Sequence, residues 1–126
     1  MNEEIETSII IPNYNGSKYI KKCLKSIEEQ EYKKFEVIII DDGSTDDSVK
    51  IIKEFIRNSN IRIELIEQFN QNAAVARNRG LEIARGKYLY FIDSDDELYD
   101  KESLSIITKE IGDNDILIGH YVSIDE

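Results

Sequence analysis

Short runs of β-branched and aromatic residues alternate along this chain with stretches whose apolar residues recur at helical spacing. The runs have the length and composition of buried strands. They lie at Thr7–Ile11, Phe35–Ile40, Ile61–Ile66, Lys87–Ile92 and Asp115–Val122. The four stretches between them have apolar faces that start at Tyr19, Val49, Ala73 and Leu104. Strands that alternate with helices favour a mostly parallel sheet covered on both faces, so the sequence predicts a Rossmann-like, three-layer α/β/α fold.

Residues typical of element ends refine this prediction. Ser44 or Thr45 is expected to be the N-cap of the second helix, and Gly86 the C-terminal glycine of the third. The fourth helix is expected to open at Asp100 and to close at Gly112. Because proline has no backbone N–H, Pro12 is expected to end the pairing of the first strand. A length of 126 residues fits one domain, residues 1–126.

Charge and composition exclude several classes of protein. The chain carries 26 Asp and Glu against 16 Lys and Arg, a net charge of −10, which argues against nucleic acid and anionic lipid as partners. The one cysteine, Cys23, excludes a disulfide framework and a structural zinc site, and we expect a buried thiol. No apolar run is long enough for a membrane span, and the N-terminus is acidic where a signal peptide is basic. We expect a cytoplasmic protein, either free or peripheral at the inner face of the membrane.

The residues that follow the first two strands are candidates for binding a ligand, because parallel sheets bind ligands at the carboxyl ends of their strands. Tyr14 lies in the loop after the first strand and offers a flat face for a nucleobase, although an ordinary turn with a half-buried tyrosine is an alternative. Asp41 and Asp42 end the second strand. Two adjacent carboxylates there need a protic or positive partner. That partner is either a ligand or the N-terminus of the next helix.

Arginines follow the third strand. Arg77 and Arg79 lie on an Ala-rich helical stretch, and a guanidinium group suits a diphosphate. The alternative for each is a surface ion pair with one of the many carboxylates.

The segment Asp93–Glu97, which follows the fourth strand, has four carboxylates within five residues. Asp93 and Asp95 are two residues apart and project to the same side of an extended backbone. A divalent cation with oxygen ligands resolves their repulsion and leaves positions open for substrate phosphates. An EF-hand loop fits badly, and the alternative is a solvated acidic turn that caps the next helix. Because the chain has no glycine-rich phosphate loop, these residues point to an enzyme whose leaving group is a nucleoside diphosphate.

Four segments together resemble a known family. They are S-I-I-I-P-N-Y-N (8–15), V-I-I-I-D-D-G-S-T-D (37–46), A-R-N-R-G-L (76–81) and Y-F-I-D-S-D-D (90–96). In this order and spacing they resemble a family 2 glycosyltransferase of the GT-A fold, from about Thr7 to Tyr99. Asn72 stands where this family often has glycine, a departure that a left-handed asparagine could absorb.

The resemblance implies roles for individual residues. Asp95 would be the direct ligand of Mn²⁺ or Mg²⁺, with Asp93 toward the ribose and the metal. Asp42 would accept a hydrogen bond from the base, with Asp41 supporting it. The nucleotide-sugar-binding residues implied are Pro12, Tyr14, Asp41, Asp42, Arg77, Asp93 and Ser94.

The implied reaction is the transfer of a sugar, with inversion, from a nucleoside-diphosphate sugar to a hydroxyl of a carbohydrate or lipid-linked acceptor. The donor expected first is a UDP-sugar. The general base is expected beyond Glu126, so residues 1–126 would be the donor-binding half, inactive or weakly active alone. One alternative is a non-catalytic nucleotide-sugar-binding module. Another is a phosphoacceptor receiver domain. Such a domain has an acidic pair after its first strand and its acceptor aspartate at the end of its third strand, where this chain has Asn13-Tyr14 and Glu67-Gln68.

Overall fold

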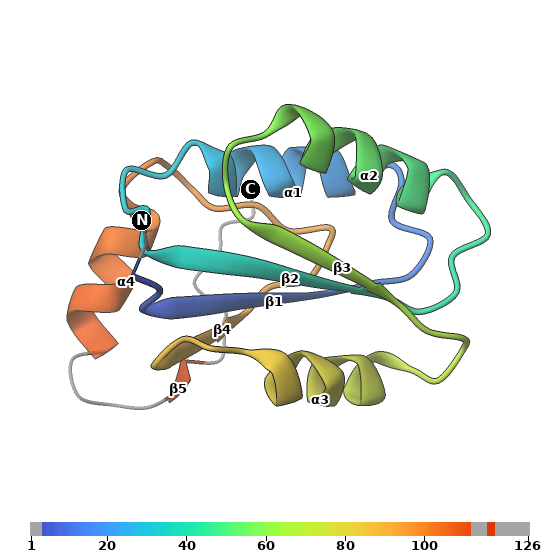
Figure 1. Ribbon diagram of the computed structural model, residues 1–126. Helices are drawn as coiled ribbons and strands as arrows, with labels where there is room; N and C mark the ends of the chain where they lie inside the picture. Colours follow the sequence, from blue (N-terminus) through green and yellow to red (C-terminus); the bar gives the residue numbers. More distant parts are fainter. Residues whose placement is uncertain (1–3, 112–115, 118–126) are drawn as a thin grey trace.

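A computed structural model of the protein describes residues 4–111 and 116–117 (Figure 1). The strands are β1 (Thr7–Asn13), β2 (Phe35–Asp41), β3 (Ile63–Glu67), β4 (Tyr88–Phe91) and β5 (Ile116–Leu117). The helices are α1 (Ile20–Glu28), α2 (Ser48–Asn58), α3 (Ala73–Ile83) and α4 (Ser103–Ile111). The predicted alternation of strands and helices is confirmed. Of the fifth predicted strand, Asp115–Val122, only β5 lies within the described residues.

The strands form one parallel sheet in the order β3-β2-β1-β4-β5. Figure 1 shows α1 and α2 over one face of the sheet, α3 over the other face, and α4 near the end where the strands begin. The predicted three-layer fold is therefore confirmed. Strand order reverses between β1 and β4, which is where such sheets bind ligands. Receiver domains have the order 2-1-3-4-5, so the strand order excludes that alternative.

Two layers of apolar side chains fill the space on either side of the sheet. Alternate residues of the central strands face opposite ways: Ile9 and Ile11 pack toward α1, whereas Ile10 and Ile38 pack with Ala76 of α3. All five side chains are almost completely buried. Coverage on both faces explains why the central strands are uninterrupted apolar runs.

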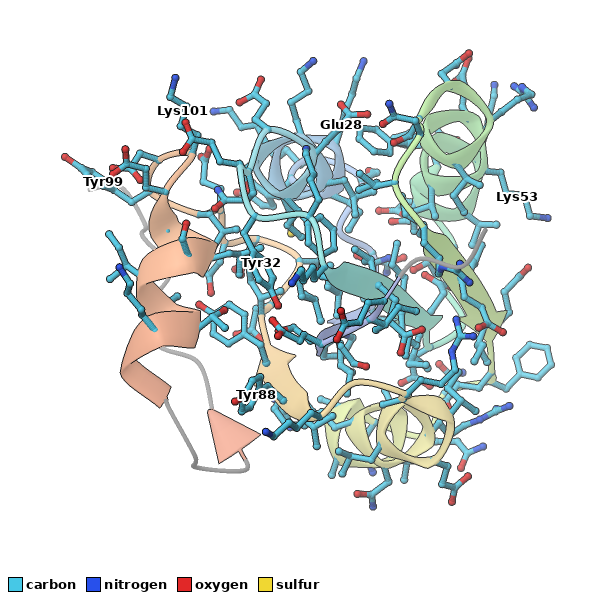
Figure 2. The ribbon with its side chains drawn as sticks, turned by 60° about the vertical axis from the view of Figure 1, so that its left-hand side comes forward. Glu28, Tyr32, Lys53, Tyr88, Tyr99 and Lys101 are labelled. Atoms are coloured by element: carbon cyan, nitrogen blue, oxygen red, sulfur yellow. The ribbon has the colours of Figure 1, made fainter. Side chains whose placement is uncertain are left out.

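The end of the sheet where the strands begin is closed by side chains. Tyr32 lies between α4 and the strands (Figure 2). Its hydroxyl donates to Glu6 Oε1 at 2.8 Å and lies 2.9 Å from Thr7 Oγ1 at the start of β1. Its ring stacks on Phe35 with centroids 6.4 Å apart. These contacts tie the starts of β1 and β2 together at the end of the sheet opposite to the one where the strands finish.

Three predicted element ends are wrong, each because a tertiary contact takes precedence. The second helix begins at Ser48, with Asp47 at its N-cap position, because Ser44 and Thr45 bond to the loop after β1 instead. Pro12 does not end β1, since the pairing with β2 continues to Asn13. The third, Gly86, lies beyond the C-cap of α3, which is Ala84. A Cβ on Gly86 would lie 2.6 Å from the backbone nitrogen of Ser8, so this glycine is needed for close approach to β1.

A fourth predicted end is displaced: α4 begins at Ser103 and not at Asp100, which lies in the turn before the helix, where its carboxylate accepts a hydrogen bond from Glu102 N at 2.9 Å. Gly112, the predicted end of that helix, lies outside the described residues.

Glu36, at the start of β2, is a buried carboxylate held by four donors, one from Ser8 and three from Arg85, of which Arg85 Nε is the most distant at 3.3 Å. Ser8 Oγ donates at 2.6 Å, Arg85 N at 2.8 Å, and Arg85 Nη2 at 3.1 Å. Desolvation by burial acts to raise the pKa of Glu36, but the hydrogen bonds from Ser8 and Arg85 outweigh it and lower the pKa. Glu36 therefore joins β1, β2 and the segment between α3 and β4 most strongly in its ionised form.

Glu36→Gln should lower the free energy of unfolding at pH 7 by about 2 kcal/mol, because the amide loses the charge-assisted bonds to Arg85 and Ser8. A folded-state pKa below the unfolded value means that Glu36 stabilises the protein above the unfolded pKa of about 4.3. This contribution is lost as pH falls through the folded pKa, so the two proteins should converge in acid. Urea unfolding between pH 7 and 3 checks this, with Glu64→Gln on the exposed side of β3 as control. A difference that stays constant over that range would contradict it.

Candidate functional site

A cleft of about 320 Å³ lies at the end of the sheet where the strands finish. The loops that follow β1, β2 and β3 all leave the sheet at this end, on the right of Figure 1. The residues that line the cleft are Pro12, Asn13, Tyr14, Asn15, Gly16, Tyr19, Asp42, Ala73, Ala76, Asp93, Ser94 and Asp95. Of the residues predicted to form a site, Asp41 and Arg77 are absent from this lining, and the others are brought together in it. The volume is within the range of small-molecule sites.

Asp41 lies beneath the cleft and is almost completely buried. Its Oδ1 accepts hydrogen bonds from Asn13 Nδ2 at 2.8 Å and Ser44 Oγ at 2.7 Å, and its Oδ2 accepts one from Ser44 N at 2.9 Å. The carboxylate thereby joins the loops after β1 and β2. For Asp41, the protic partner that two adjacent carboxylates need is supplied by donors of the protein itself.

Asp42, by contrast, is only half satisfied and lines the cleft. Its Oδ1 accepts from Gln71 N at 2.6 Å and from Gln68 Nε2 at 3.1 Å. Its Oδ2 has no hydrogen-bond partner among the described residues. The side chain is 8% exposed, so this oxygen is available to a donor on a ligand in the cleft.

The loop after β1 is fastened to both neighbouring loops. Asn15, with φ of 53°, accepts a hydrogen bond from Thr45 N at 2.8 Å. A Cβ on Gly16 would lie 2.8 Å from Ser94 Oγ, so the loops after β1 and β4 are in close contact there. This leaves Tyr14 and Tyr19 as aromatic side chains at the cleft that are about half exposed. Aromatic faces of this kind suit a nucleobase.

Asp46 fastens the same loops from outside the cleft. It accepts from Ser17 N at 3.0 Å, just before α1, and from Ser48 N at 2.9 Å, at the start of α2. Desolvation acts to raise its pKa, but the hydrogen bonds from Ser48 and Ser17 outweigh it and lower the pKa of Asp46 to about 2. Asp46 is therefore ionised at neutral pH.

A cluster of three carboxylates lies at the rim of the cleft. Asp93, Asp95 and Asp96 each offer an oxygen, and these oxygens lie within 4.8 Å of one another. The bond from Asp96 N to Asp93 O, 3.0 Å, closes a turn that returns Asp96 beside Asp93. Carboxylate oxygens on an open rim suit a hard dication that keeps positions for substrate phosphates.

Cys23 is buried below this cluster, as predicted, with its Sγ 3.9 Å from Asp93 O. Burial, followed by the charges of the nearby aspartates, raises the pKa of its thiol. The thiol is therefore protonated at neutral pH.

The predicted arginines lie on α3, away from the cleft lining. Arg77 is half-buried, Arg79 is exposed, and neither forms an ion pair within residues 4–111 and 116–117. The helix begins after Asn72, whose side chain accepts from Val75 N at 3.0 Å. Asn72 has φ of 138°, in the region that favours glycine.

Sequence reasoning missed some of the residues at the site. Asp96 also belongs to the carboxylate cluster. The signal in the sequence is the turn-forming run Asp93–Asp96, because an i to i+3 turn returns Asp96 beside Asp93. Tyr19 was assigned to the apolar face of the first helix, but it is 46% exposed at the cleft. Ala73 and Ala76, at the start of α3, line the cleft because small side chains allow the helix to lie close.

Comparison with known proteins shows what this chain is similar to. Residues 8–126 match the family described as Glycosyl transferase family 2. The chain is 42% identical over 114 residues to the "Uncharacterized glycosyltransferase YibD" of Escherichia coli K12, covering 90% of this chain and 33% of YibD.

Two solved structures share the fold. The S. aureus TarS 1–349 complex with UDP-GlcNAc has a TM-score of 0.74 and 33% identity, covering 86% of this chain and 31% of that one. The mannosyltransferase PcManGT of Pyrobaculum calidifontis, in complex with GDP-Man and Mn²⁺, has a TM-score of 0.83 and 26% identity, covering 88% and 33%. The chain spans 17% to 40% of the length of the curated glycosyltransferases YibD, GlyA and GlyG. None of the described helices is long and apolar enough to cross a membrane.

Proposed function

The chain belongs to glycosyl transferase family 2, and from this membership we propose that it binds the donor, a nucleoside-diphosphate sugar, together with a divalent cation. The whole enzyme would transfer the sugar to an acceptor hydroxyl with inversion at the anomeric carbon. One observation carries the proposal: Asp42, which has one carboxylate oxygen without a partner among the described residues, lines the same cleft as Asp93 and Asp95. A base-binding acceptor and a metal-binding cluster at one cleft are what a metal-bound nucleoside diphosphate requires.

In the metal site, Asp95 is the proposed direct ligand of Mn²⁺ or Mg²⁺. Asp93 lies toward the ribose and the metal, Asp96 is the third carboxylate of the cluster, and Ser94 contacts the donor. The cation, when bound, offsets the negative charge that develops on the leaving diphosphate. PcManGT, solved with GDP-Man and Mn²⁺, supports this assignment.

In the nucleoside site, Tyr14 and Pro12 are proposed to contact the base, and Asp42 to accept a hydrogen bond from it. Asp41 supports this arrangement from below, through Asn13 and Ser44. A UDP-sugar is the proposed donor, in keeping with the UDP-GlcNAc in the TarS structure. Arg77 is proposed to lie near the donor diphosphate.

The catalytic base and the acceptor site are proposed to belong to a part of the protein beyond these 126 residues. The chain spans about a third of YibD, which leaves most of such an enzyme to supply them. We therefore expect residues 1–126 to bind the donor but to transfer sugar weakly or not at all. The proposed acceptor is a carbohydrate or a lipid-linked carbohydrate.

For location we propose a cytoplasmic enzyme, either free or peripheral at the inner face of the membrane. Lys18, Lys21, Lys22 and Lys25 are exposed along one side of α1 and the turn before it. None forms an ion pair within the described part of the chain. The net charge of −10 opposes binding to an anionic lipid surface, and this group of lysines is the feature that favours the peripheral alternative.

Asp42→Ala should weaken UDP binding about 10-fold at saturating Mn²⁺, because one hydrogen bond from the base to a charged acceptor is lost. Calorimetric titration of the two proteins with UDP tests this. The matched control is Asp47→Ala, an exposed aspartate that makes no capping hydrogen bond at the start of α2. If Asp42→Ala and Asp47→Ala bind UDP equally well, Asp42 does not hold the base.

A further inference from the structure

Gln30 and Gln68 are both almost completely buried, yet their amide groups are satisfied to different degrees. Gln30 uses both ends: Nε2 donates to Asp100 O at 2.6 Å and to Ser26 O at 3.1 Å, while Oε1 accepts from Leu104 N at 2.9 Å. Gln68 uses one end, because Nε2 donates to Asp42 Oδ1 at 3.1 Å. Its Oε1 is buried without a partner among the described residues. Buried polar atoms are normally paired, so an unpaired one calls for a physical reason.

The orientation of the Gln68 amide is fixed by what it faces. Turning the amide over would place Oε1, an acceptor, against the carboxylate of Asp42, which in its ionised form is also an acceptor only. The unpaired Oε1 is therefore the consequence of directing Nε2 at Asp42. The backbone keeps this alignment, since Gln68 N donates to Asp41 O at 2.8 Å and continues the register between β2 and β3.

Both bonds to Asp42 end on the same oxygen. Gln68 Nε2 and Gln71 N approach Oδ1 from the loop after β3, and Oδ2 is left for the cleft. A carboxylate held at one oxygen by two donors keeps a defined direction for the other oxygen. Without the Gln68 amide, the Asp42 carboxylate would be held by the backbone N–H of Gln71 alone.

We propose that Gln68 is a positioning residue that sets the nucleobase specificity of the cleft, by fixing the Asp42 carboxylate with its Oδ2 toward the base. This rests on the proposed function, in which Asp42 accepts a hydrogen bond from the base. A fixed acceptor selects bases with a ring N–H on the pairing edge, such as uracil and guanine. It disfavours cytosine, because N3 of cytosine is itself an acceptor and its lone pair repels the lone pairs of the carboxylate. Gln68 contributes to this selection without touching the base.

The test compares Gln68→Met with Gln30→Met, the same change at the fully satisfied glutamine. UDP and CDP affinities are measured by calorimetry with Mn²⁺, and Tm by calorimetric scanning. Gln68→Met should bind UDP about 10-fold more weakly, with CDP affinity unchanged, so that the preference for UDP falls by the same factor. Its Tm should not fall, because methionine removes the unpaired Oε1. Gln30→Met should lower the Tm and leave the preference for UDP intact.

A second control is Gln71→Ala, which removes an exposed side chain but keeps the backbone N–H that bonds to Asp42. It should bind UDP as the unaltered chain does. If Gln68→Met keeps the UDP preference, or loses UDP and CDP affinity equally along with Tm, then Gln68 has no positioning role. Failure of the proposed function has a different signature: the unaltered chain does not bind UDP, or Asp42→Ala binds it undiminished.

Discussion

Asp95→Ala is expected to abolish the gain in UDP affinity that Mn²⁺ provides. Asp95 lies on the exposed rim of the cleft with Asp93 and Asp96, and the carboxylate oxygens of the three lie within 4.8 Å. A hard dication in a substrate site is held by only one or two carboxylates, with water and substrate phosphates as its other ligands, so removing the proposed direct ligand removes a main bond between the protein and the metal. The metal then no longer bridges the protein and the diphosphate. The expected loss of UDP affinity is on the order of 100-fold, or about 2.7 kcal/mol.

The measurement is a calorimetric titration of UDP into each protein, once with Mn²⁺ and once with a chelator. In the presence of the chelator, Asp95→Ala should bind UDP no more weakly than the unaltered chain. The substitution removes one negative charge from the rim and so reduces its repulsion of the diphosphate. Glu82→Ala removes the same charge from an exposed position on α3 and should behave as the unaltered chain does. If Asp95→Ala kept the Mn²⁺-dependent gain, Asp95 would not be the metal ligand.

Gly86→Ala is expected to lower the free energy of unfolding by about 3 kcal/mol. An added Cβ would lie 2.6 Å from Ser8 N and 2.7 Å from the carbonyl carbon of Thr7, both backbone atoms of β1 that cannot turn away. The displacement also strains the bond from Gly86 N to Ser8 Oγ, 2.8 Å, and with it the buried hydrogen bonds of Glu36. The start of β4 would have to move away from β1.

Urea unfolding at pH 7 measures this effect, with Gly80→Ala as the comparison. At Gly80 the three nearest atoms to the added Cβ belong to the side chain of Ile10, with Cγ2 at 2.5 Å, whereas at Gly86 two of the three are backbone atoms of β1. Ile10 is fully buried and β-branched, so Gly80→Ala should also be destabilising, and Gly86→Ala should be destabilising at least as much. An unfolding midpoint for Gly86→Ala equal to that of the unaltered chain would show that β1 and this segment are not tightly packed.

The order and type of the elements could be predicted because this sheet is covered on both faces. Residues such as Ile9 and Ile38 are buried on one side or the other, so strands appear as continuous apolar runs. The helix ends could not be predicted, because they depend on contacts between loops. Ser44 has good N-cap chemistry, but Asp41 and Asn15 engage its side chain.

The location of the candidate site could be predicted, but not which of its residues bind the ligand and which hold the loops together. The position of the acidic pair and of Asp93 and Asp95 after strands indicated the end of the sheet at which they lie. The sequence could not show that the Asp41 carboxylate is hydrogen-bonded by Asn13 and Ser44, whereas Asp42 has one oxygen without a partner among the described residues and lines the cleft. That difference arises because successive side chains point opposite ways, and which side faces the cleft depends on strand order.

Crystals of residues 1–126 grown or soaked with MnCl₂ and UDP, and measured at the manganese absorption edge, test the proposed donor site most directly. The predicted result is one strong anomalous peak bonded to a carboxylate oxygen of Asp95 and to the diphosphate, with the base against Tyr14 and within hydrogen-bond distance of Asp42 Oδ2. A peak elsewhere, or UDP bound outside this cleft, would contradict the assignment.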